Sequence, residues 1–171
     1  MHICFEKGKE KITEVDRKNM MKKSVVMLWL CILFAAVEAH ALQGDDIVGV
    51  WNNEEKDGKI EIFKCGEKYC GKIVFAKEPN YPAGSKEGVP GTPRLDHNNP
   101  DPVKKSTPIL GLLVVKDFVF TGENVWKGGT VYDPKNGKTY RGKLTLVSPN
   151  QLDLRGFVGI PLLGRTTTWT R

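Results

Sequence analysis

The chain has 171 residues, with 26 Lys and Arg against 20 Asp and Glu, and a formal net charge of +6. From residue 42 onward the basic residues stand singly between apolar ones, apart from the adjacent pair Lys104 and Lys105. Binding to the phosphate backbone of a nucleic acid needs a concentrated basic stripe, so we expect no nucleic-acid partner.

Residues 21–41 have the pattern of a secretory signal peptide. Lys22 and Lys23 precede an apolar run over 25–37, and Ala39-His40-Ala41 supplies an A-x-A cleavage site. The run is shorter than the roughly 20 apolar residues that a membrane-spanning helix needs. We therefore expect cleavage after Ala41, an exported protein in the periplasm or the medium, and no stable membrane anchor afterwards.

The remaining sequence divides simply. Residues 1–20 are charged and aperiodic, and we interpret them as an upstream extension that is not part of the mature protein. Residues 42–171 contain 19 Lys and Arg and 15 Asp and Glu, a net charge of +4, and their length fits a single domain.

Two cysteines remain after the expected cleavage site. Cys65 and Cys70 flank the tip of a predicted hairpin, and export would bring them into an oxidising compartment, so we expect a disulfide between them. A structural zinc site needs four Cys or His ligands. His97 is the only histidine after residue 41, so we expect no metal and no cofactor.

Short extended segments follow one another through most of the domain. Branched and aromatic residues, or alternation of apolar with polar residues, predict strands. Gly128-Gly129 indicates a bulge within one strand or a close approach of another backbone, and Asn136-Gly137 indicates a hairpin turn. The predicted strands cover 47–51, 59–65, 69–76, 109–120, 125–132, 140–146, a segment around 152–154, and the end of the chain.

Residues 77–108 interrupt this pattern. They contain seven of the ten prolines and three glycines, and a connection of that length is usually functional or disordered. Residues 95–102 form its densest cluster of hydrogen-bonding side chains, although Asp, Asn and Pro also build ordinary packed turns. The ligand-binding candidates in this loop are Asp96, His97, Asn99, Asp101 and Lys105.

About eight antiparallel strands in sequence order predict a closed β-barrel, because closure removes exposed sheet edges. The fold class is thus all-β, an approximately eight-stranded barrel with one long loop rich in Pro and Gly. A barrel of this size is either filled by side chains or holds one small ligand.

Several motifs carry a family resemblance over almost all of residues 42–171. They are Gly49-Val-Trp51, Asn99-Pro-Asp-Pro102 with Gly111-Leu112, Tyr132-Asp-Pro, Gly137-Lys-Thr-Tyr140, and the run from Arg155 to Arg165 followed by Trp169. Together they resemble an exported bacterial domain-of-unknown-function family, numbered 2147. That family is similar to the lipocalin (calycin) barrels, and the resemblance implies no established activity.

The resemblance also implies how one end of the barrel closes. In lipocalins an arginine near the end of the last strand packs over the tryptophan of Gly-x-Trp on the first strand. Here Trp51 and Arg171 would form that pair, with Arg165 as the alternative. The family usually has arginines near Lys105 and Thr107, and a lysine cannot grip an anion with a planar fork.

Three functions remain open. The first is a binding module for a small apolar or amphipathic molecule, with the long loop over the barrel mouth. The second is an enzyme that uses Asp96, His97 and Asp101. We do not expect it, because no nucleophile motif or phosphate loop accompanies these residues. The third is a ligand-free structural or protein-interaction domain of the cell envelope.

Overall fold

The computed structural model describes Glu14, Arg17 and residues 43–171. The expected extension over 1–20, the signal peptide over 21–41, its cleavage site and the start at Leu42 lie outside the described residues. Residues 42–171 form a compact unit of their own. In the described part of the chain, no helix is both long and apolar enough to cross a membrane.

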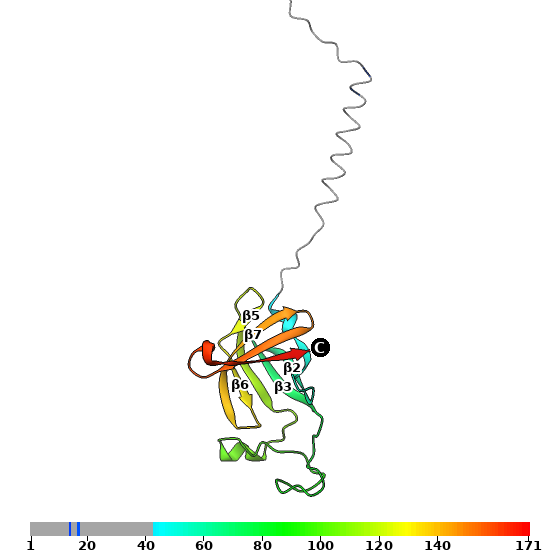
Figure 1. The fold of residues 1–171 in the computed structure, drawn as a ribbon, viewed down its shortest axis with the longest axis vertical. Helices are drawn as coiled ribbons and strands as arrows, with labels where there is room; N and C mark the ends of the chain where they lie inside the picture. The colour runs from blue at the N-terminus through cyan, green and yellow to red at the C-terminus, as the bar shows by residue number, and fades with distance from the viewer. Residues whose placement is uncertain (1–13, 15–16, 18–42) are drawn as a thin grey trace, which may run out of the picture. The chain divides into compact units, whose positions relative to one another are not determined.

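The unit is an antiparallel β-barrel in which all strands except β5 and β6 pair with their neighbours in sequence (Figure 1). Short 3-10 helices stand at Gly44–Ile47 (η1), Pro102–Ser106 (η2) and Pro161–Leu163 (η3). The strands are β1 (Gly49–Asn52), β2 (Gly58–Cys65), β3 (Lys68–Ala76), β4 (Leu113–Phe120), β5 (Val125–Lys127), β6 (Thr130–Asp133), β7 (Lys138–Ser148), β8 (Gln151–Phe157) and β9 (Arg165–Thr170).

The nine segments make eight strand positions. β5 and β6 both pair with β4 on one side and with β7 on the other, so they are two halves of one interrupted strand. Gly128 and Gly129 separate them, as predicted from the sequence. A side chain at Gly129 would overlap the ring of Phe118, and Gly128 has a φ of +82°. The prediction of an eight-stranded, lipocalin-like barrel is confirmed.

Two pairings close the barrel. β3 pairs with β4 across the long connection, and β1 pairs with β9 at Asn52 and Thr170. The Asn52 side chain strengthens this short contact, because its Nδ2 donates to the carbonyl of Thr170 at 3.0 Å.

The predictions from the sequence start two strands too early. Residues 44–47 form η1 rather than the beginning of β1, because the side chain of Asp46 accepts a hydrogen bond from the backbone N–H of Gln43 and favours a tight turn. The strand expected over 109–120 begins only at Leu113. Gly111, with a φ of +87°, turns the chain just before it.

One end of the barrel is solidly packed. Phe118 fills the middle of the barrel, where Gly142 leaves room for its ring. η1 covers the end, and two buried indoles hold it: Trp51 Nε1 donates to the carbonyl of Ile47, and Trp126 Nε1 to that of Gly44. The other large buried side chains of this end are Ile62, Leu144, Leu146 and Leu152.

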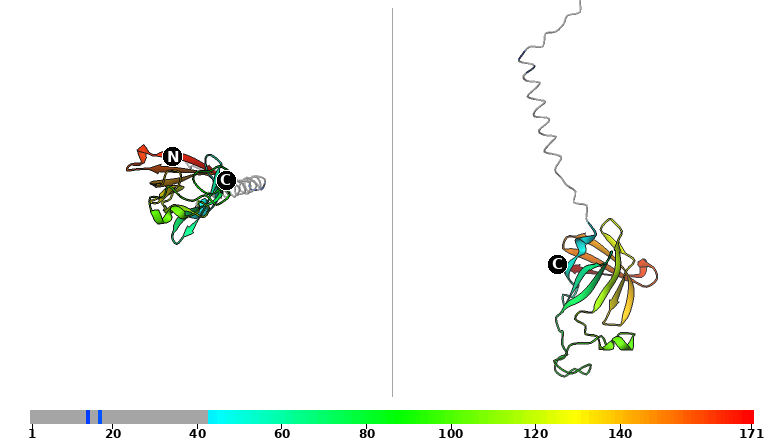
Figure 2. Two further views of the ribbon diagram at one scale, coloured as in Figure 1. Left: turned by 90° about the horizontal axis from the view of Figure 1, so that it is seen from below. Right: turned by 180° about the vertical axis from the view of Figure 1, so that it is seen from behind.

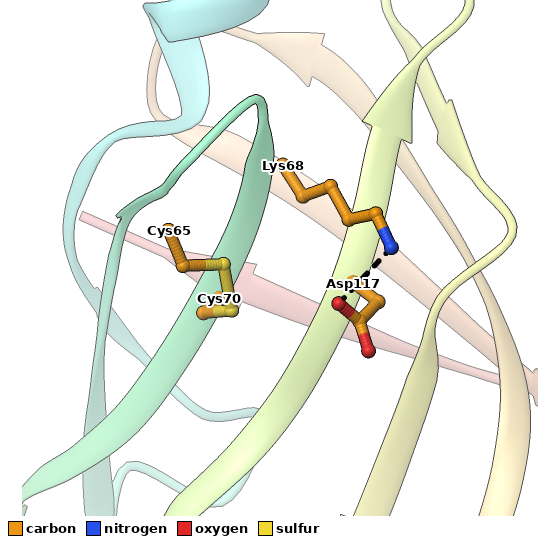
Figure 3. Close-up of a disulfide and its surroundings, with 4 residues drawn as sticks. All are labelled: Cys65, Lys68, Cys70 and Asp117. Atoms are coloured by element: carbon orange, nitrogen blue, oxygen red, sulfur yellow. Dashed lines mark hydrogen bonds and ion pairs between the residues drawn. A yellow bond between two sulfur atoms is a disulfide. The ribbon is translucent and has the colours of Figure 1, made fainter.

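The cysteine hairpin joins β2 to β3 at this packed end. Cys65 and Cys70 form the disulfide that the sequence predicted, with Cα atoms 5.8 Å apart (Figure 3). Beside it, Lys68 Nζ lies 3.3 Å from Asp117 Oδ1, so an ion pair links the start of β3 to β4.

Because the strands run up and down, alternate connections gather at the opposite end. The turns β1–β2 and β6–β7, the long connection over 77–112 and the β8–β9 loop over 158–164 all lie there. In Figure 1 the long connection is the green segment below the barrel, and the β8–β9 loop is red at its left edge. Figure 2 shows the same two segments from below and from behind.

Candidate functional site: a cavity at the open end of the barrel

A cavity of ≈1540 Å³ occupies the end of the barrel where these loops meet. Ordinary small-molecule pockets are roughly 300–1,000 Å³. This cavity is larger because it is open to solvent and continues from the barrel interior to the space beneath the long connection, where Tyr81, Leu95 and His97 line it.

The inner wall of the cavity is apolar. It is formed by side chains from β2, β3, β4, β6, β8 and β9, which point inward because alternate residues of a strand share a face. They are Ile60, Ile73, Val114, Val131, Leu154 and Trp169. Phe118 and Trp126 belong to the fully buried core and do not line the cavity. The barrel is therefore filled at one end and hollow at the other.

The mouth of the cavity is polar and charged. Three of its basic side chains are in ion pairs: Arg94 with Glu78 at 3.0 Å, Lys135 with Asp57 at 3.5 Å, and Arg165 with Glu54 at 3.7 Å. Lys59 and Lys77 also line the mouth, and neither has an ion-pair partner among residues 43–171. The Nζ of Lys59 lies 5.5 Å from the centroid of the Phe75 ring.

Aromatic side chains surround the same opening and join the apolar wall to the polar rim. Tyr81 is buried and stacks on His97, with 5.9 Å between ring centroids. Its hydroxyl also accepts the backbone N–H of Leu95 at 2.9 Å and is hydrogen-bonded to His97 Nε2. The other aromatic residues at the mouth are Phe75, Tyr132, Tyr140 and Phe157.

Three predicted ligand residues form a network within the long connection. Asp96 is fully buried and accepts hydrogen bonds from the Tyr132 hydroxyl and from Asn99 Nδ2, each at 2.7 Å. Asn99 Oδ1 accepts the backbone N–H of Asp101, and the Asp101 carboxylate accepts that of Val103 and so caps η2. The side chains of Asp96, Asn99 and Asp101 do not line the cavity.

This network perturbs two ionisable groups. Burial raises the pKa of Tyr132 above its ordinary value, and the hydrogen bond to Asp96 adds to the effect. The hydrogen bond from Lys104, together with the backbone N–H of Val103, lowers the pKa of Asp101. Tyr132 therefore stays a neutral donor to Asp96 and ties β6 to the connection.

The five loop candidates thus have different positions. His97 lines the cavity, whereas Lys105 is exposed on η2 and does not. That Asp96, Asn99, Asp101 and Lys105 contact a ligand stays a prediction. Among residues 43–171, no group of three His, Cys, Asp and Glu side chains is placed to hold a metal ion.

Arg171 and Trp51 meet at the packed end. The Arg171 guanidinium carbon lies 4.2 Å from the centroid of the Trp51 ring. The same guanidinium group donates to the carbonyls of Pro149, Val48 and Asp46. Arg165, the alternative partner for Trp51, lies instead at the cavity mouth.

Sequence reasoning missed the cavity wall. Alternation within the predicted strands identifies Ile60, Val131 and Leu154 as inward-facing, but it does not say which inward residues touch one another and which border empty space. Tyr81 had no signal at all, because it stands in a segment without periodicity.

A closed antiparallel barrel of eight strand positions is the architecture of the lipocalin-like proteins. Protein HP1028 from Helicobacter pylori, described as belonging to the lipocalin family, is similar to this chain with a TM-score of 0.60. The two are 23% identical over 73% of this chain and 82% of that one, which shows the shared fold.

Residues 49–171 match the family model described as an uncharacterised protein conserved in bacteria, DUF2147, and the chain belongs to this family. The resemblance stated from the sequence motifs is confirmed. No curated protein matches the chain.

Proposed function

We propose that this protein is an exported barrel that binds one small apolar or amphipathic molecule in the cavity at its open end. The observation that carries the proposal is the hollow half of the barrel. Its inner wall is made of Ile, Val, Leu and Trp side chains, and its mouth carries aromatic, basic and acidic groups. An apolar pocket with a few polar groups at one end suits a ligand with a hydrocarbon body and a polar head.

The charges at the mouth do not select the sign of the head group. The mouth is lined by five basic side chains, Lys59, Lys77, Arg94, Lys135 and Arg165, and by five acidic ones, Glu55, Asp57, Glu78, Glu87 and Asp133. The proposal therefore specifies a ligand with an apolar body and a polar head, without a preferred charge.

Binding, rather than catalysis, is also the proposal that fits the polar groups. The carboxylate of Asp96 is buried and engaged by Tyr132 and Asn99, and His97 Nε2 is engaged by Tyr81. A general base has to reach the proton that it removes. These groups are instead used to hold the connection in shape.

A pair of variants tests the proposal. Thr167, on β9, lines the cavity, whereas Val147, on β7, is 54% exposed and does not line it. Thr167→Trp should fill part of the hollow and weaken the binding of cis-parinaric acid, a fluorescent fatty acid, by about tenfold or more, which corresponds to about 1.4 kcal/mol. Val147→Trp adds an indole outside the barrel and should leave the affinity within about twofold.

Fluorescence titration measures both affinities, and thermal melting shows whether each variant is folded. Thr167→Leu adds less volume and serves as a milder variant if the Trp substitution prevents folding. If the wild-type protein binds neither this fatty acid nor a lysophospholipid, the ligand-free envelope domain is the better account. Equal losses in both Trp variants would also contradict the cavity as the site.

Export is part of the same proposal. The Cys65–Cys70 disulfide supports it, because such bonds persist in oxidising compartments. The intact mass of protein taken from the periplasm or medium should correspond to a chain that begins at Leu42. A mass that retains residues 21–41 would contradict the cleavage, and recovery only from the cytoplasm would contradict export.

A further inference from the structure

The β8–β9 loop, residues 158–164, exposes a group of aliphatic side chains beside the cavity mouth. The exposed fractions are 72% for Val158, 56% for Ile160, 81% for Leu162 and 78% for Leu163. Isolated exposed apolar residues need no explanation, but four within six positions form a patch of the kind that marks an interaction site.

Arg155 holds this loop in its exposed shape. Its Nε donates to the carbonyl of Pro161 at 2.7 Å and its Nη2 to that of Leu162 at 3.0 Å, while its Nη1 donates to Thr166 Oγ1 at 2.9 Å. The guanidinium group thereby anchors the backbone of η3 to β8 and β9. The aliphatic side chains are displayed by a fixed turn and are not covered by the barrel.

Basic residues lie on the strands beside the patch. Residues 138–167 contain five Lys and Arg and one Asp, a net charge of +4, whereas residues 43–137 contain 13 Lys and Arg and 14 Asp and Glu, a net charge of −1. The strand register places Lys143 opposite Arg155 and Arg141 opposite Phe157, next to the loop. Arg165 follows the loop directly, and its exposed side chain lies 3.7 Å from Glu54.

We propose that the 158–164 loop and the basic residues around it dock this protein onto an anionic lipid surface, with the aliphatic side chains entering the bilayer interface. Lipid headgroups of negative charge complement the net charge of +4 on residues 138–167, and each Lys or Arg near such a surface adds to the attraction. The projecting side chains are all Val, Ile or Leu, whereas protein-protein hot spots are enriched in Trp, Tyr and Arg.

The position of the loop connects this surface to the cavity. Val158 and Leu163 belong both to the exposed patch and to the lining of the mouth, so a bilayer that receives the loop would meet the opening of the barrel. Exchange of a lipid-like molecule between the bilayer and the cavity rests on the proposed function. Docking itself does not.

Vesicle flotation tests the docking. The protein is purified from the soluble fraction of a bacterial host that expresses the full chain. It should float with vesicles of phosphatidylethanolamine and phosphatidylglycerol, and binding to phosphatidylcholine vesicles should be at least about tenfold weaker. Raising the salt to about 0.5 M should weaken the first interaction, because screening reduces the attraction between exposed charges.

The double variant Ile160→Ser with Leu162→Ser removes apolar side chains that do not line the cavity, and its partition onto the anionic vesicles should fall by about tenfold. The matched control is Val89→Ser with Val103→Ser, which removes two side chains that are 69% and 83% exposed elsewhere. That control should bind the vesicles like the wild type.

Three outcomes would overturn the proposal: no flotation of the wild type, equal flotation of the loop variant, or equal losses in the loop variant and the control. If vesicles are not bound but sedimentation shows a dimer that the loop variant loses, the patch is an interface with a second copy. Binding of cis-parinaric acid without vesicles reports on the cavity separately, so either proposal can fail while the other holds.

Discussion

At the scale of single residues, Arg171 has the most contacts to lose. It lies over the Trp51 ring and donates to three carbonyls from two separate segments, residues 46–48 and Pro149. We expect Arg171→Ala to lower the free energy of unfolding by about 2 kcal/mol, because the cation–π contact and the hydrogen bonds are lost together. Arg171→Lys keeps the charge but cannot span all three carbonyls, so it should lose most of the same amount.

Urea unfolding of these two variants measures the effect. Arg141→Ala is a suitable control, since the Arg141 guanidinium carbon lies farther from its ring, 5.9 Å from the centroid of Phe157. An Arg171→Ala protein as stable as the wild type would show that the packed end closes without this arginine.

The hydrogen bond between Tyr69 and Asp45 predicts how the stability of the packed end depends on pH. The Tyr69 hydroxyl donates to Asp45 Oδ1 at 2.6 Å. Burial and this hydrogen bond raise the pKa of Tyr69 to about 12, from an ordinary value of 10.0. The hydrogen bond from Tyr69, aided by Lys64, lowers the pKa of Asp45 below 3.8.

The two shifts act at opposite ends of the pH scale. The Tyr69 contribution to stability is complete below pH 10 and is lost as pH rises towards 12. The Asp45 contribution is complete above pH 3.8 and is lost as pH falls through its lowered pKa in the folded state. Urea titrations at a series of pH values measure the free energy of unfolding. Tyr69→Phe should reduce its fall at alkaline pH and also its fall at acid pH, whereas Asp45→Asn should remove the acid contribution. If Tyr69→Phe loses as much stability at alkaline pH as the wild type does, the Tyr69 hydroxyl is not the group responsible.

At the scale of elements, the long connection is held by the Asp96 network. Asp96→Ala would leave the Tyr132 hydroxyl and Asn99 Nδ2 without their acceptor, at about 1–3 kcal/mol for each group that stays buried. We expect a loss of about 3 kcal/mol in the free energy of unfolding. Asp101→Ala, which removes the cap of η2 and an exposed ion pair with Lys104, should lose about 1 kcal/mol.

Chemical denaturation and fatty-acid titration of the same two variants distinguish the roles of these residues. Loss of stability with ligand affinity retained would show that Asp96 supports the connection. Affinity lost at full stability would instead show that Asp96 contacts the ligand, as the sequence suggested.

The same elements show what a sequence can and cannot predict. Strand alternation in β7 and β8, the Asn136-Gly137 turn and the bulge at Gly128-Gly129 were visible because each depends on neighbouring residues. The role of Asp96 was not, because its partner Tyr132 lies 36 positions away. A cluster of Asp and Asn has the same composition whether it binds a ligand or forms the hydrogen bonds that hold its own loop together.

At the scale of the whole molecule, the central feature is the division of the barrel into a filled half and a hollow half. A barrel of eight strand positions can have either a solid or a hollow interior, and the size of the inward-facing side chains decides which parts of the interior are filled. Phe118, Trp126 and Trp51 fill one half, while the Ile, Val and Leu residues of the other half line the inner part of the ≈1540 Å³ cavity. This division depends on contacts between distant strands, so strand prediction alone could not provide it.

Methyl NMR during titration with oleate tests this division most directly, because methyl groups mark both halves. Signals from Ile60, Ile73, Val114, Val131 and Leu154 should shift, since these side chains line the cavity. Signals from Ile62, Leu144, Leu146 and Leu152 at the packed end should stay close to their original positions. Shifts in neither set, or shifts only at exposed methyls such as those of Val103 and Val147, would contradict a ligand site inside the barrel.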